Sequence, residues 1–194
     1  MDTYEKKRQL RREIAERKKS IEPTAWLTKS NLISQRIFDI LTKTPHKSIG
    51  IFMSLKDEWT TDLLLSLLKE SGYEVSIPRV EGDDMRFYPY LPTSLEISDK
   101  FKIREPLAST ENEMVPEVIV VPGVTFDSFR QRLGRGKGYY DRYLSQHLED
   151  IKYTIAGCFD ELMVSEIPTE SHDRSVDFLV TDTHIFSDSG STQY

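Results

Sequence analysis

The sequence of 194 residues is poor in the residues that build disulfides and membrane spans. Its single cysteine, Cys158, excludes an intramolecular disulfide and a zinc site made of cysteines. Its apolar runs are far shorter than the roughly 20 residues that a helix needs to cross a bilayer. The first eight residues, Met-Asp-Thr-Tyr-Glu-Lys-Lys-Arg, also lack the apolar segment of a signal peptide. We therefore expect a cytoplasmic protein with no membrane partner.

Acidic residues outnumber basic ones, and the formal net charge is −6 at pH 7. This charge argues against a general nucleic-acid binder. Residues 5–19 are the exception, because they hold eight Lys or Arg against three Glu. Local positive charge in an acidic protein favours a site for a small anionic ligand. The alternative is that this basic run is only the solvated face of a helix.

A single domain spanning residues 1–194 is the simplest expectation at this length. Apolar residues at helical or strand spacing, with proline and glycine as stops, predict its elements. The predicted helices are a basic N-terminal helix 3–19, then 24–41, a helix capped within 60–62 that ends at Gly72, and 138–148. The predicted strands are 49–54, 74–77 (stopped by Pro78), 85–90, 118–121, 153–158 and 177–181. Residues 91–115 are expected to have little regular structure, and residues 187–194 to be a disordered tail.

Strands that alternate with helices predict an α/β fold, here a three-layer α/β/α arrangement with a mainly parallel sheet and helices on both faces. In such sheets ligands bind beyond the carboxyl ends of the strands. The loops after strands 49–54, 74–77 and 118–121 carry, respectively, Lys56-Asp57-Glu58, Arg79 and a segment rich in Gly and Arg. We therefore expect these three loops to share one site.

The segment rich in Gly and Arg is the clearest functional signal in the chain. Between Gly123 and Gly138 lie four of the nine glycines, with Arg130, Arg132, Arg135 and Lys137 among them. Glycines let the backbone approach a ligand, and backbone N–H groups backed by cations bind phosphate. The spacing matches neither the Walker motif nor the dinucleotide fingerprint. A basic surface turn is the alternative, but alternating glycines followed by two tyrosines favour a phosphate site.

Three acidic residues are candidates for ligand binding. Asp141 follows the glycines directly and is well placed for Mg²⁺, although a pair with Arg142 or a contact with a helix dipole is the alternative. Asp173 is a second metal candidate, or a simple loop acid. Glu58 follows a buried strand, where it suits a polar heterocycle or the N-terminus of a helix. Four aromatic residues are candidates for ligand stacking or for the core: Phe87, Tyr88, Tyr139 and Tyr140.

The motif from Arg132 to Asp141, Arg-Leu-Gly-Arg-Gly-Lys-Gly-Tyr-Tyr-Asp, resembles the 5-formyltetrahydrofolate cyclo-ligases, also called 5,10-methenyltetrahydrofolate synthetases. The likeness covers nearly the whole chain. Other similar segments are Lys7–Arg11, Phe52–Glu58, Ile77–Arg79, Arg104–Pro106, Val121–Asp127, Gly157–Asp160 and 167–177. In one place the chain departs from the family, because residues 128–131 are Ser-Phe-Arg-Gln where the family usually has a glycine turn.

The resemblance implies an enzyme that closes 5-formyltetrahydrofolate to 5,10-methenyltetrahydrofolate and converts ATP to ADP and phosphate with Mg²⁺. It implies that ATP contacts Lys7, Arg11, Arg132, Leu133, Gly134, Arg135, Gly136, Lys137, Gly138, Tyr139 and Tyr140. It implies that the folate contacts Met53, Glu58, Gly136, Lys137, Gly138, Tyr139 and Tyr140. Arg135 and Lys137 are then the catalytic cations, and Asp141 and Asp173 the metal ligands. We expect a monomer that binds no nucleic acid.

Two other functions remain as alternatives. Another ATP-dependent ligase or kinase would keep the ATP residues but not those assigned to the folate. A non-catalytic RNA-binding protein would use the Arg-Gly segment and tyrosines to stack bases. The net charge of −6 argues against the RNA-binding alternative.

Overall fold

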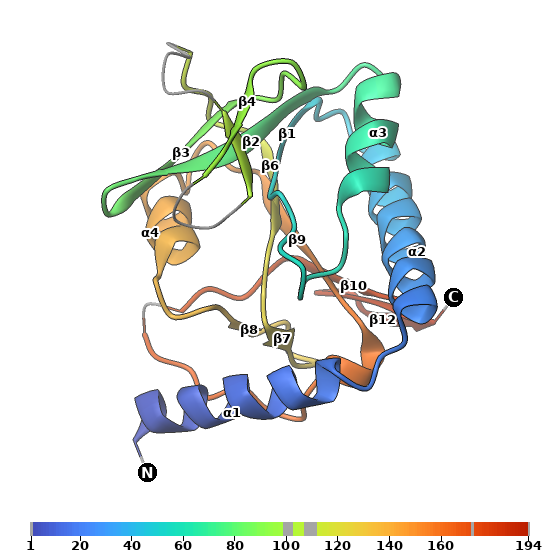
Figure 1. The fold of residues 1–194 in the computed structure, drawn as a ribbon, viewed down its shortest axis with the longest axis vertical. Helices are drawn as coiled ribbons and strands as arrows, with labels where there is room; N and C mark the ends of the chain where they lie inside the picture. Colours follow the sequence, from blue (N-terminus) through green and yellow to red (C-terminus); the bar gives the residue numbers. More distant parts are fainter. Residues whose placement is uncertain (1, 99–102, 107–111, 172, 194) are drawn as a thin grey trace.

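The computed structural model describes residues 2–98, 103–106, 112–171 and 173–193. Its centre is an eight-stranded sheet in the order β12-β11-β10-β9-β6-β1-β2-β3 (Figure 1). The strands are β1 (Ser48–Ile51), β2 (Glu74–Glu81), β3 (Asp84–Pro89), β6 (Val118–Val121), β9 (Tyr153–Cys158), β10 (Phe178–Thr181), β11 (His184–Ser187) and β12 (Gly190–Gln193). The strands from β10 to β2 are all parallel, while β3, β11 and β12 add antiparallel edges.

Burial explains why the sequences of the parallel strands are short apolar runs. Every residue of β6 is buried, and β6 lies between β1 and β9 with Ile49 opposite Val118. A strand covered on both faces needs apolar side chains on both faces, so strict alternation is lost. The predicted strand 118–121 is confirmed, and its continuous apolar sequence reflects this burial on both faces.

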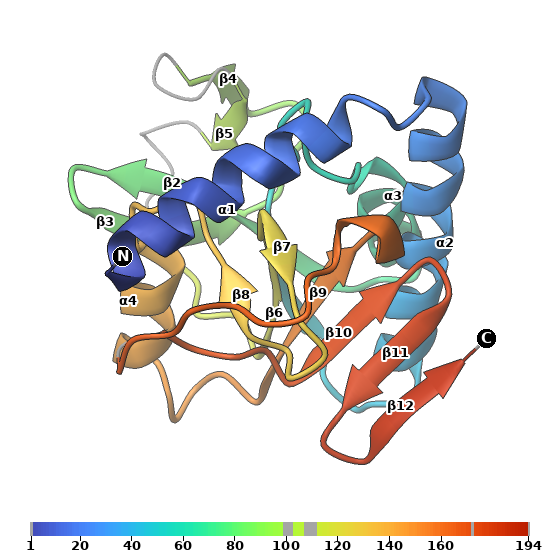
Figure 2. The same cartoon turned by 90° about the horizontal axis from the view of Figure 1, so that it is seen from below.

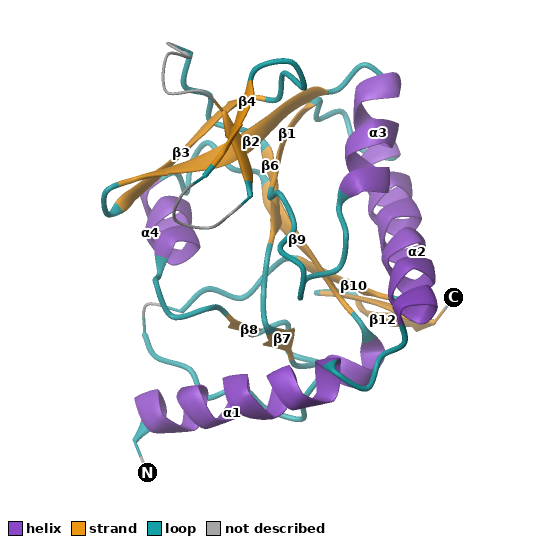
Figure 3. Ribbon diagram, viewed as in Figure 1, coloured by secondary structure: helices purple, strands orange, loops and turns teal. Residues whose placement is uncertain are grey.

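The helices cover both faces of the sheet (Figure 3). Helices α2 (Pro23–Thr42) and α3 (Asp62–Glu70) pack together on one face, and α4 (Tyr139–Gln146) packs against β3 on the other. The predicted α/β fold with helices on both faces is therefore confirmed. Helix α1 (Thr3–Lys18) lies instead across the edge where the parallel strands end (Figure 2). In the described residues, no helix combines the length and the apolar character that a bilayer crossing needs.

Short elements lie at this same edge and complete the fold near α1. Strands β7 (Thr125–Phe126) and β8 (Arg132–Leu133) form a small hairpin, and the 3₁₀ helix η1 (Asp160–Leu162) follows β9. The buried Asp127 organises the hairpin loop, since its carboxylate accepts hydrogen bonds from the backbone N–H groups of Phe129, Gln131 and Ile167 at 2.9–3.0 Å. The hairpin leads directly into the glycine segment.

Three predictions about secondary structure were wrong. The second strand does not stop at Pro78 but continues to Glu81, because beyond Ser76 it pairs only with β3 and no longer with β1. A proline is tolerated on such a free edge, where its missing N–H is not needed. Within 91–115, strands β4 (Leu95–Ile97) and β5 (Arg104–Pro106) pair as a separate sheet, while 99–102 and 107–111 lie outside the described residues.

The C-terminal tail was the third error. Residues 187–193 are not disordered, because β11 and β12 form an antiparallel hairpin on the edge of the main sheet. Gly190 adopts φ +108° at the turn, a conformation open to glycine. The polar strand was missed because its pairing, rather than apolar spacing, holds it in place. Residue 194 lies outside the described residues.

Candidate functional site

A cleft of about 330 Å³ opens between α1, the β7-β8 hairpin and the start of α4. Lys7, Arg11 and every residue from Arg132 to Asp141 line it. These positions lie more than 120 residues apart in the chain, yet the crossing of α1 over the ends of the strands brings them together (Figure 2). Glu58 and Asp173 also line the cleft, so it gathers all the residues assigned to ATP, both metal candidates and every residue assigned to the folate except Met53.

The glycine loop has the backbone conformation that its sequence suggests. Gly136 and Gly138 adopt φ +91° and +68°, which L side chains rarely adopt. A Cβ atom on Gly136 would lie 3.4 Å from the Arg11 guanidinium. Arg11 also donates from Nε to the carbonyl of Gly134 at 2.7 Å, which fixes the loop against α1. Gly138 is the N-cap of α4, so the positive end of that helix dipole faces the loop.

Lys7 joins α1 to the loop that carries Asp173. Its buried Nζ lies 2.5 Å from Asp173 Oδ2 and 2.9 Å from Glu170 Oε2. Burial alone would lower the pKa of Lys7, but the two carboxylates outweigh burial and raise it. Lys7 is therefore a protonated cation at neutral pH. Its placement in the cleft favours the anion-binding interpretation of the basic run over that of a solvated helix face.

Asp141 pairs with Arg132 and not with Arg142. Arg142 instead donates to the carbonyls of Lys137 and Asp83 at 2.9 and 2.7 Å. Across the described residues, no three acidic, histidine or cysteine side chains form a ready metal cluster. This is compatible with Mg²⁺ on a nucleotide, which uses one or two protein carboxylates and takes its other ligands from phosphates and water. The carboxylates of Asp141 and Asp173 line the cleft and fit that requirement.

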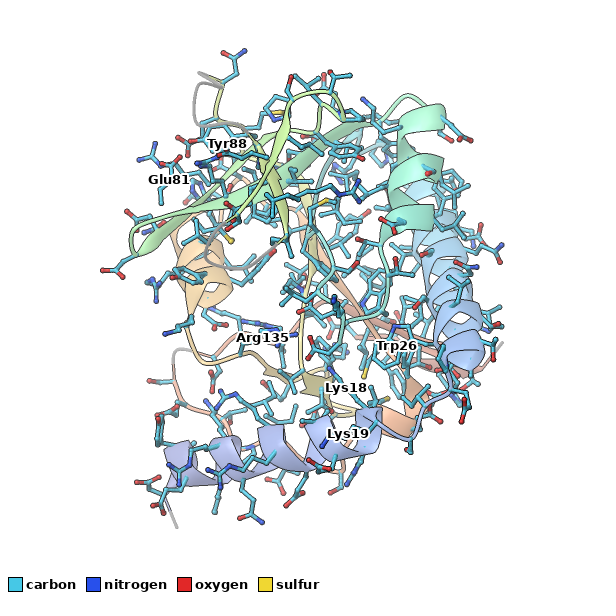
Figure 4. The ribbon with its side chains drawn as sticks, in the orientation of Figure 1. Lys18, Lys19, Trp26, Glu81, Tyr88 and Arg135 are labelled. Carbon is cyan, nitrogen blue, oxygen red and sulfur yellow. The ribbon has the colours of Figure 1, made fainter. Side chains whose placement is uncertain are left out.

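Glu58 is buried beside the loop and holds Arg135. Its Oε2 accepts from the backbone N–H of Leu55 at 2.9 Å, and its Oε1 accepts from Arg135 Nε at 3.0 Å. Arg135 Nη2 also donates to Asp57 at 2.7 Å. These carboxylates raise the pKa of Arg135 although burial alone would lower it. Figure 4 shows Arg135 in the space between α1 and α4, where it links the glycine loop to the loop after β1.

Tyr140 presents a buried hydroxyl without a partner in the described part of the chain. Burial raises the pKa of this phenol, so it stays protonated and can donate a hydrogen bond. The ring lines the cleft, and a buried polar atom without a partner is costly unless a ligand or water supplies one. Tyr140 is therefore positioned to contact a bound ligand.

Other sequence candidates do not line this cleft. Met53 is buried in the core, and Arg79 pairs with Glu96 at 2.6 Å beside β5. Phe87 packs on Tyr143, with ring centroids 5.1 Å apart, and Tyr88 donates to Glu81 at 2.7 Å. Phe87 and Tyr88 are therefore packing residues of β3 rather than stacking groups of the cleft.

Four lining residues were not assigned to the site from the sequence: Tyr4, Pro122, Gly123 and Glu170. Tyr4 precedes Lys7 by three residues, so helical spacing alone places both on one side of α1. Glu170 lies three residues before Asp173, and both contact Lys7. The helical spacing was a usable signal for Tyr4, whereas the contact of Glu170 with Lys7 depends on the tertiary fold.

Comparison with known proteins agrees with this geometry. The model of the 5-formyltetrahydrofolate cyclo-ligase family matches residues 3–182. The mouse 5-formyltetrahydrofolate cyclo-ligase is 31% identical, with 88% of this chain and 91% of the mouse protein covered. The Saccharomyces cerevisiae protein of the same name is 28% identical over 90% of this chain and 94% of its own.

Solved structures have the same fold. The 5,10-methenyltetrahydrofolate synthetase from Aquifex aeolicus superposes with a TM-score of 0.75 at 25% identity, covering 93% of this chain and 92% of that one. The enzyme of that name from Mycoplasma pneumoniae gives a TM-score of 0.72 at 22% identity, covering 91% and 98%. The family match spans the parallel strands, α1 and the glycine loop, and it therefore includes all the residues that line the cleft. This chain belongs to the 5-formyltetrahydrofolate cyclo-ligase family.

Proposed function

We propose that this protein closes 5-formyltetrahydrofolate to 5,10-methenyltetrahydrofolate and converts ATP to ADP and phosphate. The observation that carries the proposal is the convergence of the glycine loop, Lys7 and Arg11 on one cleft with the buried carboxylate Glu58 at its side. The cations and the loop suit a triphosphate, and the carboxylate suits the N–H donors of a pterin ring. Family membership supports this reaction.

The chemistry needs no nucleophile from the protein. The formyl oxygen on N5 attacks the γ-phosphorus of ATP, and the bond to the β-phosphate oxygen breaks to release ADP. The folate N10 then attacks the activated formyl carbon. The carbon–oxygen bond breaks, phosphate leaves and N10 loses its proton, which gives the methenyl bridge. The protein contributes position and charge neutralisation, as in other phosphoryl transfers.

The roles of the residues follow from their place in the cleft. Lys7 and Arg11 from α1, with the backbone from Arg132 to Tyr140, bind the phosphates of ATP. Lys137 is exposed and, among the described residues, has no ion pair, so it is available to the migrating phosphoryl group together with Arg135. Glu58 binds the pterin, and Tyr140 donates its buried hydroxyl to a bound substrate.

Asp141 and Asp173 would hold Mg²⁺ with the phosphates. The ion, when bound, neutralises phosphate charge and orients the triphosphate. The two aspartates rest against Arg132 and Lys7, so each carboxylate has a nearby cation in the cleft before nucleotide enters. The negative charge of ATP then attracts those same cations.

The direct test is the absorbance of methenyltetrahydrofolate in a mixture of purified protein, 5-formyltetrahydrofolate and Mg²⁺, with and without ATP. We expect a rise that depends on ATP. A folded protein that binds ATP and gives no rise would contradict the folate reaction and favour another ATP-dependent ligase or kinase. RNA binding near micromolar affinity without ATP turnover would contradict both.

Glu58→Gln separates the folate role from the ATP role. We expect a large loss of folate turnover with ATP binding largely kept, because the amide has a weaker acceptor and one less charge. Turnover and ATP affinity are measured in the same preparation. Unchanged folate kinetics would remove Glu58 from substrate binding.

A further inference from the structure

We propose that Asp57 is a positioning residue that holds Arg135 on Glu58 until nucleotide binds, so that ATP and folate assist each other's binding. The inference rests on the proposed function. Asp57 lies next to Glu58 in the loop after β1 and does not line the main cleft. Its role is to set where Arg135 rests, and it contacts neither substrate.

One guanidinium bridges two neighbouring carboxylates. Arg135 Nε donates to Glu58 at 3.0 Å, and its Nη2 donates to Asp57 at 2.7 Å. The Glu58 side chain is only 7% exposed, whereas that of Asp57 is 52% exposed. Arg135 therefore neutralises a buried charge through one nitrogen and is anchored by a more exposed charge through another.

Arg135 and a pterin compete for the same acceptor. The amino group and the adjacent ring N–H of a pterin form a pair of donors similar to one edge of a guanidinium. A buried carboxylate that loses one such donor needs another, because an unpaired buried charge is strongly unfavourable. A pterin can therefore replace Arg135 on Glu58, but only when Arg135 has somewhere to go.

The glycine loop and the phosphates supply that destination. Arg135 lies between Gly134 and Gly136, so neither neighbouring residue has a side chain. Gly136 also has φ +91°, a conformation that glycine adopts readily. The Arg135 side chain is 41% exposed and lines the cleft with Lys7 and Arg11. A triphosphate there offers Arg135 charge-assisted hydrogen bonds at least as strong as those it leaves.

Asp57 keeps a second ion pair when Arg135 leaves, whereas Glu58 forms no second ion pair among the described side chains. Lys18 Nζ lies 3.7 Å from Asp57 Oδ2 and donates to the Asp57 carbonyl at 2.6 Å. The Lys18 side chain is only 9% exposed, so it is held in place (Figure 4). Departure of Arg135 therefore leaves one vacant acceptor, Glu58, and the folate fills it.

The expected consequence is reciprocal coupling. Nucleotide should tighten folate binding by about tenfold, and folate should tighten nucleotide binding by the same factor. In Asp57→Asn the anchor for Arg135 is weakened. Folate should then bind more tightly without nucleotide, and the coupling factor should shrink to about twofold or less.

Calorimetric titration of the full chain with 5-formyltetrahydrofolate tests this, with and without a non-hydrolysable ATP analogue and Mg²⁺. Asp39→Asn is the matched control, because it is the same substitution at an exposed position of α2. This variant should keep the full coupling. Thermal melts check that both variants are folded. A purely structural role of Asp57 would lower the melting temperature and leave the coupling factor unchanged.

The outcomes are distinct. Folate binding with equal affinity in the presence and absence of the analogue would overturn the inference and leave the proposed function standing. Full coupling in Asp57→Asn would also overturn it, because direct contact between the two ligands would then be the cause. Nucleotide binding with no folate binding in any variant would overturn the proposed function, and the inference with it.

Discussion

At the scale of the residue, Arg130 holds a backbone conformation that favours glycine. It is the one described non-glycine residue with positive φ, at +63°. Its Nε donates to the Val176 carbonyl at 3.0 Å, its guanidinium pairs with Asp188, and its own carbonyl accepts from Val176 N–H at 3.1 Å. Side-chain contacts thus offset a backbone conformation that favours glycine.

Two substitutions at Arg130 separate backbone strain from side-chain contacts. Arg130→Ala and Arg130→Gly both remove the guanidinium, but only alanine keeps a Cβ atom at positive φ. We expect Arg130→Ala to be less stable than Arg130→Gly by about 1 kcal/mol. Urea unfolding of the two variants measures the difference. Equal free energies of unfolding would mean that the turn relaxes and carries no strain.

Lys137 is the residue whose loss should separate activity from stability. Lys137→Ala should lower turnover by about 10²–10³-fold, the typical effect of removing a group that stabilises transition-state charge. The free energy of unfolding should change by less than about 0.5 kcal/mol, because the side chain is exposed. Turnover at saturating ATP and urea unfolding are compared with those of Lys69→Ala on α3. Near-normal turnover in folded Lys137→Ala would remove this lysine from the chemistry.

At the scale of the element, α1 is a functional part that lies outside the layers of the fold. Its N-cap is Asp2, whose Oδ1 accepts from the backbone N–H of Glu5 at 2.7 Å. The first two turns of α1 carry Tyr4 and Lys7 to the cleft, and the buried Ile14 anchors the later turns. The order of the first turn therefore affects ligand binding more than it affects the core.

Asp2→Ala should weaken ATP binding without altering the chemical step. Loss of the cap destabilises the first turn by about 1 kcal/mol, which corresponds to a rise in KM for ATP of up to about fivefold. The kcat should be unchanged, since the glycine loop is untouched. Steady-state kinetics measure both constants. Gln9→Ala, an exposed change within α1, serves as the control, and an equal rise in KM there would contradict a specific role for the cap.

Elements were predicted well where burial requires apolar residues. They were predicted poorly where backbone pairing alone holds a strand in place. Val118–Val121 and Tyr153–Cys158 were predicted with their observed bounds, because buried parallel strands require apolar residues. The β11-β12 hairpin and the β4-β5 pair were missed. Their strands lie at edges or outside the main sheet, where polar side chains are tolerated and backbone hydrogen bonds decide the structure.

At the scale of the whole molecule, the burial of Cys158 in the core links the stability of the fold to pH. It lies at the end of β9, is 5% exposed, and its Sγ lies 3.4 Å from the Phe159 carbonyl. Burial raises the pKa of the thiol from its ordinary 9.0 to about 12. The folded protein thus keeps the thiol protonated at pH values where the unfolded chain forms a thiolate.

The raised pKa predicts a loss of stability at alkaline pH. Above about pH 9 the unfolded chain releases the thiol proton while the folded chain retains it, so the free energy of unfolding falls until the folded pKa near 12. The expected slope from this group approaches 1.4 kcal/mol per pH unit. Urea unfolding from pH 8 to 10.5 measures it. Cys158→Ala should remove this part of the slope, and an identical slope in both proteins would contradict it.

The sequence by itself determined the α/β class, the parallel strands and the conformational freedom of the glycine loop, because apolar spacing and the positions of glycines are properties of neighbouring residues. The match of residues Arg132 to Asp141 with one family came from the same local information. The partners of the charged residues depended on the tertiary structure. Sequence reasoning placed Arg135 beside phosphate, yet the fold rests it on Glu58 and Asp57. Arg132, rather than Arg142, holds Asp141, and Lys7 reaches Asp173 across the cleft. Which carboxylate a long charged side chain pairs with depends on distance and burial. The fold sets both of these only when α1 lies across the ends of the strands.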